Sequence, residues 1–198
     1  PSRLVHYEGI FWNREYPATS DMESQMYTPV ADIKKFLAEH PEKPFIMCEY
    51  SHAMGNSCGG IADYTEYAYE EPLYQGGFIW EYMDHGIAVI SPDGKPGFAY
   101  GGDFGDKPND GNFAFNGVFR GDRSPNPHYY EVVKCYQQVD FTRVGNTLQI
   151  VNRFMFTPLS AFALRLTLSD ESGVLQEETM DLPAAGHLEK VKIDIPFD

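Results

Sequence analysis

The chain has 198 residues, of which 42% are hydrophobic and 15% aromatic, and its formal net charge at pH 7 is −14. This length predicts one or two domains, and the hydrophobic fraction is sufficient for a buried core. The negative charge, without any cluster of Lys and Arg, argues against nucleic acid as a partner and disfavours anionic membranes and acidic ligands. We therefore expect a neutral ligand.

The cysteines Cys48, Cys58 and Cys135 are widely spaced, which fits neither a disulfide framework nor a zinc site. We expect reduced, partly buried thiols. No apolar run reaches about 18 residues, so no membrane span is predicted, and no signal peptide is predicted within this sequence. Because it begins without Met, we expect a fragment of a longer protein.

The first part of the chain contains short apolar segments that predict buried strands. In chain order these are residues 3–9, 22–29 (the weakest), 43–50 and 74–84. Helical spacing of apolar residues predicts helices over residues 30–40 and 60–72, each followed or closed by Pro, and a last helix within 123–134. This alternation predicts parallel strands with crossover helices. Residues 85–121 have the composition of loops.

From about residue 139 the pattern changes. Residues 140–156, 161–182 and 188–197 alternate apolar and polar side chains between turn signals, which predicts antiparallel strands with one buried face and no helix. We place a domain boundary after residue 139. The second piece has about 60 residues, whereas an immunoglobulin-like sandwich takes roughly 100, so we expect part of a sandwich.

The predicted strands of the first part end in acids and aromatics. In parallel α/β barrels the functional residues lie where strands end. Aromatic rings pack on the apolar face of a pyranose, and carboxylates bind hydroxyls and break glycosidic bonds. The pattern therefore predicts a sugar site. The strand-end residues are Glu8, Tyr27, Glu49, Trp80, Glu81 and Asp84.

Glu49 is the leading candidate among them. It follows the apolar run 45–48, so we expect it to be largely buried and held by partners. A carboxylate aimed at an anomeric carbon can act as a nucleophile, with the Tyr27 hydroxyl donating to it. The alternative is a structural carboxylate bonded to Tyr and backbone. His52 would bind a sugar hydroxyl or be satisfied by the loop backbone, and Trp80 would stack on the sugar or fill the core.

An Asx-rich segment raises the question of a metal site. Its side chains offer the hard oxygen ligands that suit Na⁺, Mg²⁺ or Ca²⁺, although their spacing is not that of an EF-hand. A plain turn-rich loop would have the same composition. The residues are Asp103, Asp106, Asn109, Asp110 and Asn116.

The motifs CEYSHAMGNS, QGGFIWEYMD and YGGDFGDKPND…FNG strongly resemble those of the large β-galactosidases of glycoside hydrolase family 2. The resemblance implies an α/β fold, in which residues 1–139 are the C-terminal half of the catalytic TIM (β/α)₈ barrel. Residues 140–198 would be the start of an antiparallel, immunoglobulin-like β-sandwich. The implied reaction is hydrolysis of terminal β-D-galactose from β-galactosides by a retaining double displacement.

The resemblance also implies roles for individual residues. Glu49 matches the nucleophile and Tyr27 the tyrosine beside it, although Gln25 stands where the family often has Pro. The implied metals are Na⁺ and Mg²⁺: Phe113, through its carbonyl, and Asn116 match sodium-ligand positions, and Asn109 matches a position near a second magnesium. The implied substrate-binding residues are His52, Trp80, Asn116, Met26 and Tyr50.

The sequence departs from the family pattern in one important respect. The family's acid/base lies in an "NE" motif on the fourth barrel strand, and this chain has no such motif. We therefore expect half a site, incomplete metal sites and an isolated chain without activity. The expected partners are a β-galactoside and the remainder of the parent chain or a complementing subunit. We expect a bacterial cytoplasmic parent that forms homo-oligomers, and dimerisation or aggregation of the isolated piece through its open strand edges.

Two alternatives remain open at this stage. One is a related β-glucuronidase or β-mannosidase, although the FNG loop and the lack of a basic cluster favour a neutral galactoside over a uronate. The other is a non-enzymatic β-sandwich module that binds carbohydrate or serves assembly. Against it, the acids and aromatics at strand ends belong to the α/β part.

Overall fold

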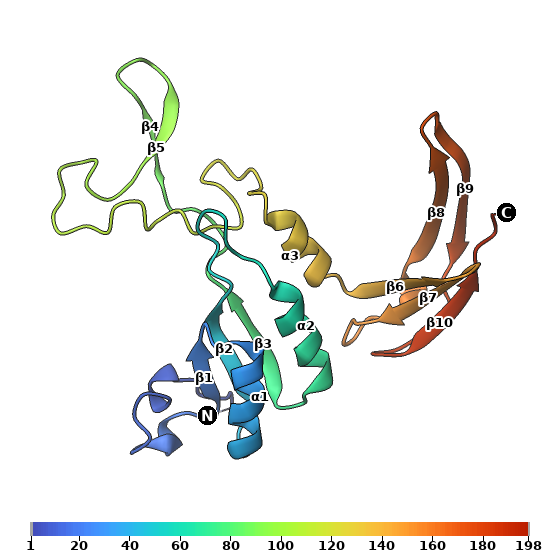
Figure 1. The fold of residues 1–198 in the computed structure, drawn as a ribbon, viewed down its shortest axis with the longest axis horizontal. Helices are drawn as coiled ribbons and strands as arrows, with labels where there is room; N and C mark the ends of the chain where they lie inside the picture. Colours follow the sequence, from blue (N-terminus) through green and yellow to red (C-terminus); the bar gives the residue numbers. More distant parts are fainter. Residues whose placement is uncertain (1, 198) are drawn as a thin grey trace. The chain divides into compact units, whose positions relative to one another are not determined.

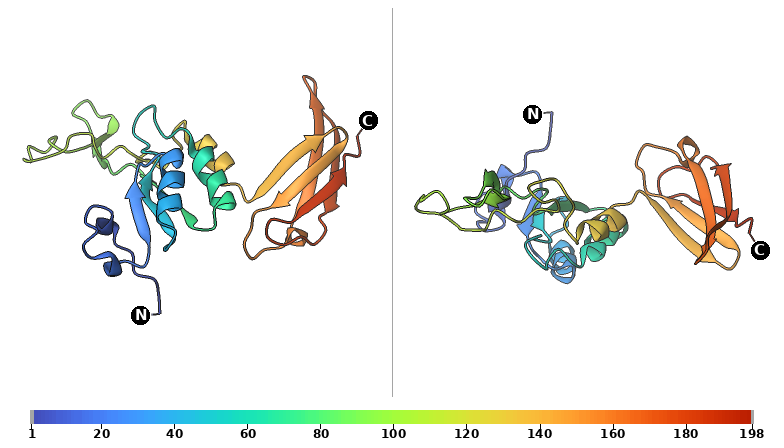
Figure 2. Two further views of the ribbon diagram at one scale, coloured as in Figure 1. Left: turned by 60° about the horizontal axis from the view of Figure 1, so that its bottom comes forward. Right: turned by 90° about the horizontal axis from the view of Figure 1, so that it is seen from above.

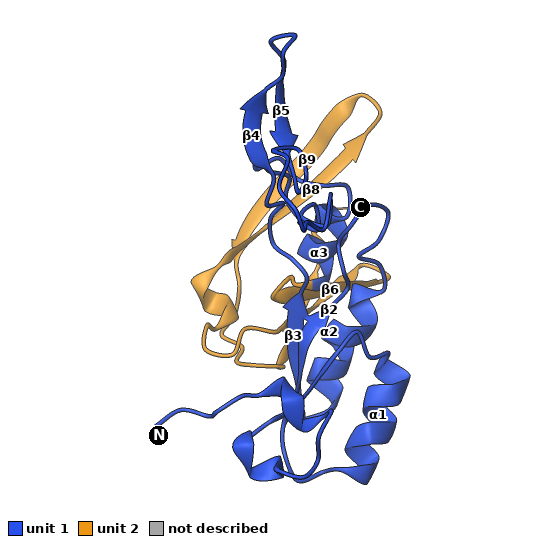
Figure 3. Cartoon of the chain, turned by 90° about the vertical axis from the view of Figure 1, so that its left-hand side faces the viewer, with its two compact units in different colours: residues 1–135 blue, residues 136–198 orange. Residues whose placement is uncertain are grey.

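The computed structural model describes residues 2–197. Contacts along the chain divide it into two units, Pro1–Cys135 and Tyr136–Asp198 (Figure 3), whereas the predicted domain boundary follows residue 139. Within the described residues, no helix is long and apolar enough to cross a membrane.

The first unit is built on a parallel sheet of three strands. These are β1 (Glu23–Met26), β2 (Phe45–Tyr50) and β3 (Tyr74–Ile79), in the order β1-β2-β3. Three of the four predicted strands of this part are thereby confirmed. Parallel neighbours need crossover connections, which the two intervening helices supply.

The helices α1 (Val30–Glu39) and α2 (Ile61–Glu70) lie side by side on one face of this sheet (Figures 1 and 2). Helix α1 buries Ile33 and Leu37 and ends before Pro41, because the residue preceding a proline is driven out of the helical conformation. Both predicted helices are confirmed, and they cover the sheet as a barrel's outer helices do.

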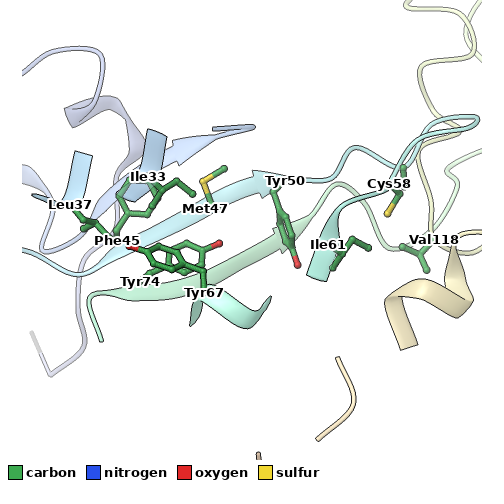
Figure 4. Packing of buried hydrophobic residues seen from close by; sticks show 11 residues of the cluster. Ile33, Leu37, Phe45, Met47, Tyr50, Cys58, Ile61, Tyr67, Tyr74 and Val118 are labelled. Atoms are coloured by element: carbon green, nitrogen blue, oxygen red, sulfur yellow. The ribbon is translucent and has the colours of Figure 1, made fainter. Parts of the chain in front are cut away.

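The core lies between the sheet and these two helices (Figure 4). Strand β2 contributes Phe45, Met47 and Tyr50, and the rings of Tyr67 and Tyr74 stack with their centroids 5.1 Å apart. Each fully buried side chain of this size contributes roughly 1.5–3 kcal/mol to folding. The core therefore fixes β2 firmly, and with it the residues at the end of β2.

The predicted strand over residues 3–9 is not formed. Leu4 and Val5 are exposed, so no apolar face holds this segment on the sheet. Val5 instead makes two hydrogen bonds with Asp21: its N–H donates to the Asp21 carboxylate, and its carbonyl accepts from the Asp21 N–H, both at 2.8 Å. Short 3-10 helices follow at Glu8–Ile10 and Pro17–Thr19.

The segment 85–121, predicted to be loop, contains an antiparallel hairpin of β4 (Ile87–Ile90) and β5 (Pro96–Ala99). The tight turn between them is closed by a hydrogen bond from Ser91 N–H to the Lys95 carbonyl. Ile87 and Ile90 are exposed. The hairpin therefore lacks the alternation of buried and exposed residues by which a strand is recognised.

Two further features complete the first unit. Met83 and Phe119 form an isolated parallel bridge, which joins the segment after β3 to the segment around Asn116. Helix α3 (Tyr129–Cys135) confirms the predicted last helix. It begins after Pro127, later than the first residues of the predicted range.

In the described part of the second unit the secondary structure consists of strands and the 3-10 turn Leu159–Ala161. One antiparallel sheet has the order β10 (Lys190–Asp194), β7 (Thr147–Asn152), β6 (Val139–Val144). In a second sheet β8 (Ala163–Asp170) pairs with β9 (Gly173–Asp181). Residues of both sheets, including Ile150 and Leu164, share one core. The predicted antiparallel pattern is confirmed.

Candidate active site

Glu49 and Tyr27 meet where two neighbouring parallel strands end. The Tyr27 hydroxyl donates to Glu49 Oε2 at 2.7 Å, and the Tyr27 N–H donates to the Glu49 carbonyl at 2.9 Å. Gln25 pairs with Met47 and Met26 with Glu49, so the register of β1 against β2 shifts at this point. Such irregularities re-aim side chains at functional sites, and here Glu49 is fixed through both its backbone and its carboxylate.

The backbone turns sharply after both strands. Tyr27 has φ of 56° and Ser51 has φ of 49°, which is the left-handed region that residues other than glycine rarely adopt. Each such residue costs on the order of 1–3 kcal/mol and persists where surrounding contacts enforce it. The two hydrogen bonds from Tyr27 to Glu49 provide that enforcement for the first of them.

The Tyr27 phenol keeps its proton firmly. Burial raises its pKa well above the ordinary value, and the hydrogen bond and negative charge of Glu49 raise it further. The hydroxyl is therefore a permanent donor to the Glu49 carboxylate. Glu49 itself is half-buried, less than the large burial predicted from the apolar run before it.

His52 lies beside this pair and carries an unused polar atom. Its ring stacks on Phe113 with centroids 5.4 Å apart and lies 6.0 Å from the Tyr27 ring. The buried His52 Nε2 has no hydrogen-bond partner within residues 2–197. A buried polar atom without a partner costs about 1–3 kcal/mol, so a ligand hydroxyl that reaches Nε2 would be bound favourably.

Trp80 is tied to the same loop by its backbone. Its N–H donates to the Tyr50 carbonyl at 3.1 Å, and its carbonyl accepts from Ala53 N–H at 2.7 Å. The peptide bond from Trp80 to Glu81 is cis. Trp80 is 36% exposed, so part of this residue faces solvent.

Asn116 is the most buried polar residue of the group, at 2% exposure. Its Nδ2 donates to the Phe113 carbonyl at 3.1 Å and, more weakly, to Glu81 Oε1 at 3.5 Å. Its Oδ1 is buried and has no partner in the part of the chain that the structure describes. This oxygen is suited to a hydroxyl donor or a cation.

Glu81 was predicted at a strand end, but no role in this site was predicted for it. The structure places it against Asn116 and within hydrogen-bond distance of His85, whose Nε2 lies 3.1 Å from Glu81 Oε2. The i, i+4 spacing of Glu81 and His85 is the only sequence signal for this pair, and it does not indicate the contact with Asn116.

The other predicted site residues are dispersed. Met26 is exposed, next to Tyr27. Tyr50 is only 1% exposed and packs in the core against Tyr64, with ring centroids 4.9 Å apart, so its side chain cannot contact a sugar as predicted. Asn109 lies in an exposed turn, where it donates to the Asp106 carbonyl at 2.8 Å and accepts from Gly111 N–H at 3.1 Å.

Carboxylate-rich metal sites are not found among the described residues, since no three His, Cys, Asp or Glu side chains gather closely enough to hold an ion. A metal bound here would rely on carbonyl and amide oxygens. Asn116 Oδ1 and the Phe113 carbonyl are such oxygens.

The family model described as "Glycosyl hydrolases family 2, TIM barrel domain" matches residues 1–141. The chain belongs to glycosyl hydrolase family 2. This membership confirms the resemblance drawn from the three motifs, and it confirms the predicted fold class, in which the parallel sheet and its helices are part of a TIM barrel.

Several curated relatives are named β-galactosidase. The protein from Halalkalibacterium halodurans is 46% identical over 198 residues, which cover 100% of this chain and 19% of that protein. The one from Priestia megaterium is 46% identical over 184 residues, 91% of this chain and 18% of the relative. The β-galactosidase large subunit of Latilactobacillus sakei is 48% identical over 138 residues, 69% of this chain and 22% of that subunit. The chain thus spans about a fifth of the length of these relatives.

Proposed function

We propose that this chain is part of a retaining β-galactosidase and carries its nucleophile, Glu49. The observation that supports this most strongly is the carboxylate of Glu49 held by Tyr27 at the ends of two adjacent parallel strands. Buried, unpartnered polar atoms of His52 and Asn116 accompany it. The names of the relatives suggest the galactoside.

In the proposed reaction Glu49 attacks the anomeric carbon of the sugar. The bond from that carbon to the aglycone oxygen breaks, a covalent glycosyl-enzyme forms, and water then hydrolyses the ester. Because the Tyr27 hydroxyl is hydrogen-bonded to Glu49 Oε2, we assign Glu49 Oε1 as the attacking atom. The Tyr27 hydroxyl orients the carboxylate before attack and stabilises it again when it leaves.

The sugar would be recognised by the remaining polar and aromatic groups. His52 Nε2 and Asn116 Oδ1 offer the buried atoms that lack partners among the described residues, and each would be satisfied by a hydroxyl of the ring. Trp80 offers an indole face for the apolar side of the pyranose. Met26 would line the exposed rim beside Tyr27.

A retaining mechanism also needs an acid/base carboxyl about 5–5.5 Å from the nucleophile. Glu81 is engaged by His85 and Asn116, and Glu8 accepts a hydrogen bond from the Trp12 indole at 2.9 Å. We therefore assign the acid/base to another part of the parent chain or to a complementing subunit, and we expect the isolated chain to be inactive.

For metals, the donor set fits Na⁺ better than Mg²⁺. Asn116 Oδ1 is an unpartnered buried oxygen, and the Phe113 carbonyl lies beside the same amide. Binding by both oxygens requires rotation of the amide, because Nδ2 now faces the carbonyl. When bound, Na⁺ would supply positive charge for a sugar hydroxyl. The Asn109 side-chain amide is already hydrogen-bonded through both Nδ2 and Oδ1, so it does not fit as a Mg²⁺ ligand in this arrangement.

The test introduces Glu49→Gln into the full-length protein and measures hydrolysis of an aryl β-galactoside. The matched control is Glu39→Gln, at the exposed end of α1. Glu49→Gln should lower kcat by about 10³-fold or more, equivalent to about 4 kcal/mol. The control should match the wild type. Retention of most activity by Glu49→Gln would show that Glu49 is structural. The wild type is also assayed on an aryl β-glucuronide and an aryl β-mannoside. Faster turnover of either would show that it, and not the galactoside, is the preferred substrate.

A further inference from the structure

The peptide groups of Gly117 are held by three side chains from outside its own segment. The Gly117 N–H donates to Asp84 Oδ1 at 2.8 Å. Its carbonyl accepts from Asn126 Nδ2 at 2.8 Å and lies 3.1 Å from His128 Nε2, within reach of a donated N–H. We refer to Asp84, Asn126 and His128 as the Gly117 clamp.

The residues on either side of Gly117 are held as well. The Asn116 carbonyl accepts from Glu81 N–H at 2.8 Å, and Val118 N–H donates to the Glu81 carbonyl at 2.9 Å. These two bonds leave the N–H and carbonyl of Gly117 pointing to the opposite side, toward the clamp. Every backbone polar group from the Asn116 carbonyl to the Val118 N–H is therefore engaged.

Gly117 also has no room for a side chain. It is buried, and a Cβ added there would lie 2.2 Å from the Asp84 backbone nitrogen. Its φ is not in the left-handed region, so the requirement for glycine comes from this close approach of two chain segments. Any shift of the segment would move Asn116, which is linked to it by one peptide bond.

We propose that the Gly117 clamp positions Asn116 for the sugar. Asp84, Asn126 and His128 are positioning residues: they do not touch the substrate but fix the backbone from which the Asn116 amide projects. The proposal rests on the proposed function, because it assumes that Asn116 contacts the galactoside. Misplacement of a binding group by about 1 Å can cost as much as 10²-fold in rate, so the clamp has a measurable effect.

The test compares Asp84→Ala with Asp84→Asn in the full-length protein. The alanine removes the acceptor for the Gly117 N–H, whereas the asparagine retains an oxygen at that place. We expect Asp84→Ala to raise KM for an aryl β-galactoside about tenfold, and Asp84→Asn to remain within about threefold of the wild type. His128→Ala and His128→Gln form a second pair, in which the glutamine amide restores a donor to the Gly117 carbonyl.

Asp170→Ala is the control, because Asp170 also accepts a backbone N–H, from Ser172 at 2.7 Å, but in the second unit. A loss of active enzyme with KM unchanged would show that the clamp is merely structural and would overturn the proposal. If Asp84→Ala does not fold, the KM values of the two His128 variants provide the same test.

Glu49→Gln is measured in the same experiment. An inactive wild type or an active Glu49→Gln would overturn the function and the clamp together, whereas normal KM in the clamp variants beside a silent Glu49→Gln would overturn the clamp alone.

Discussion

Tyr27→Phe removes a single oxygen from the centre of the site. The hydroxyl donates to Glu49 Oε2 at 2.7 Å, a charge-assisted hydrogen bond worth about 1.5–3 kcal/mol. If that energy is expressed in the transition state, kcat falls by about 10-fold to 150-fold, because each 1.36 kcal/mol is a factor of ten. The backbone bond from Tyr27 N–H to the Glu49 carbonyl remains, so the fold is retained.

The assay separates the two chemical steps. In the second step of the proposed reaction Glu49 would be the leaving group from the glycosyl-enzyme, and loss of the Tyr27 hydroxyl would leave the departing carboxylate without its donor. We expect the covalent intermediate to accumulate, which is seen as a burst of aglycone before a slow steady state in rapid-mixing experiments. Tyr16→Phe, an exposed tyrosine of the same unit, is the control. A kcat within threefold of the wild type for Tyr27→Phe would refute the reasoning.

Three further predictions concern other parts of the chain. Gly117→Ala places a Cβ 2.2 Å from the Asp84 nitrogen, and we expect a loss of about 1–3 kcal/mol in the free energy of unfolding of the full-length protein, measured by urea denaturation; unchanged stability would contradict the close approach. Burial raises the pKa of Cys58 to about 11, so at pH 8 iodoacetamide should modify Cys58 more slowly than the half-buried Cys135, as followed by peptide mass spectrometry; equal rates would contradict its burial. Burial and Glu49 raise the pKa of Tyr27, so the folded state keeps this proton where the unfolded state loses it. The free energy of unfolding of the wild type should therefore decline as the pH rises above about 10, and it should decline more than that of Tyr27→Phe. Melting temperatures that fall equally in the two proteins between pH 9 and 11 would contradict this.

The sequence was informative where a segment has its own apolar pattern. Helix α1 and strand β2 were predictable because Ile33, Leu37, Phe45 and Met47 are spaced for their elements and are buried as that spacing requires. The meeting of Tyr27 and Glu49 was predictable for the same reason, since adjacent parallel strands end at one edge.

Contacts between distant segments were not predictable. Asn116 meets Glu81 across 35 residues, and the donors of the Gly117 clamp lie 9 and 11 residues away from Gly117. No local periodicity encodes such contacts. The β4–β5 hairpin was missed because its strands are exposed. The segment 3–9 was misassigned because a short apolar run has the same appearance whether or not a face exists to bury it.

One register shift explains why Glu49 is less buried, and Tyr50 more buried, than expected. Alternation along β2 would place Phe45, Met47 and Glu49 on one face, and it would bury Glu49 and leave Tyr50 facing outward. The pairing with both neighbouring strands is irregular after Met47, and the third buried residue of β2 is Tyr50 instead of Glu49. The shift exchanges the two side chains: a tyrosine enters the core, and the carboxylate is released from it to meet Tyr27. This irregularity of the pairing is thus the feature that leaves the Glu49 carboxylate outside the core and within reach of the Tyr27 hydroxyl.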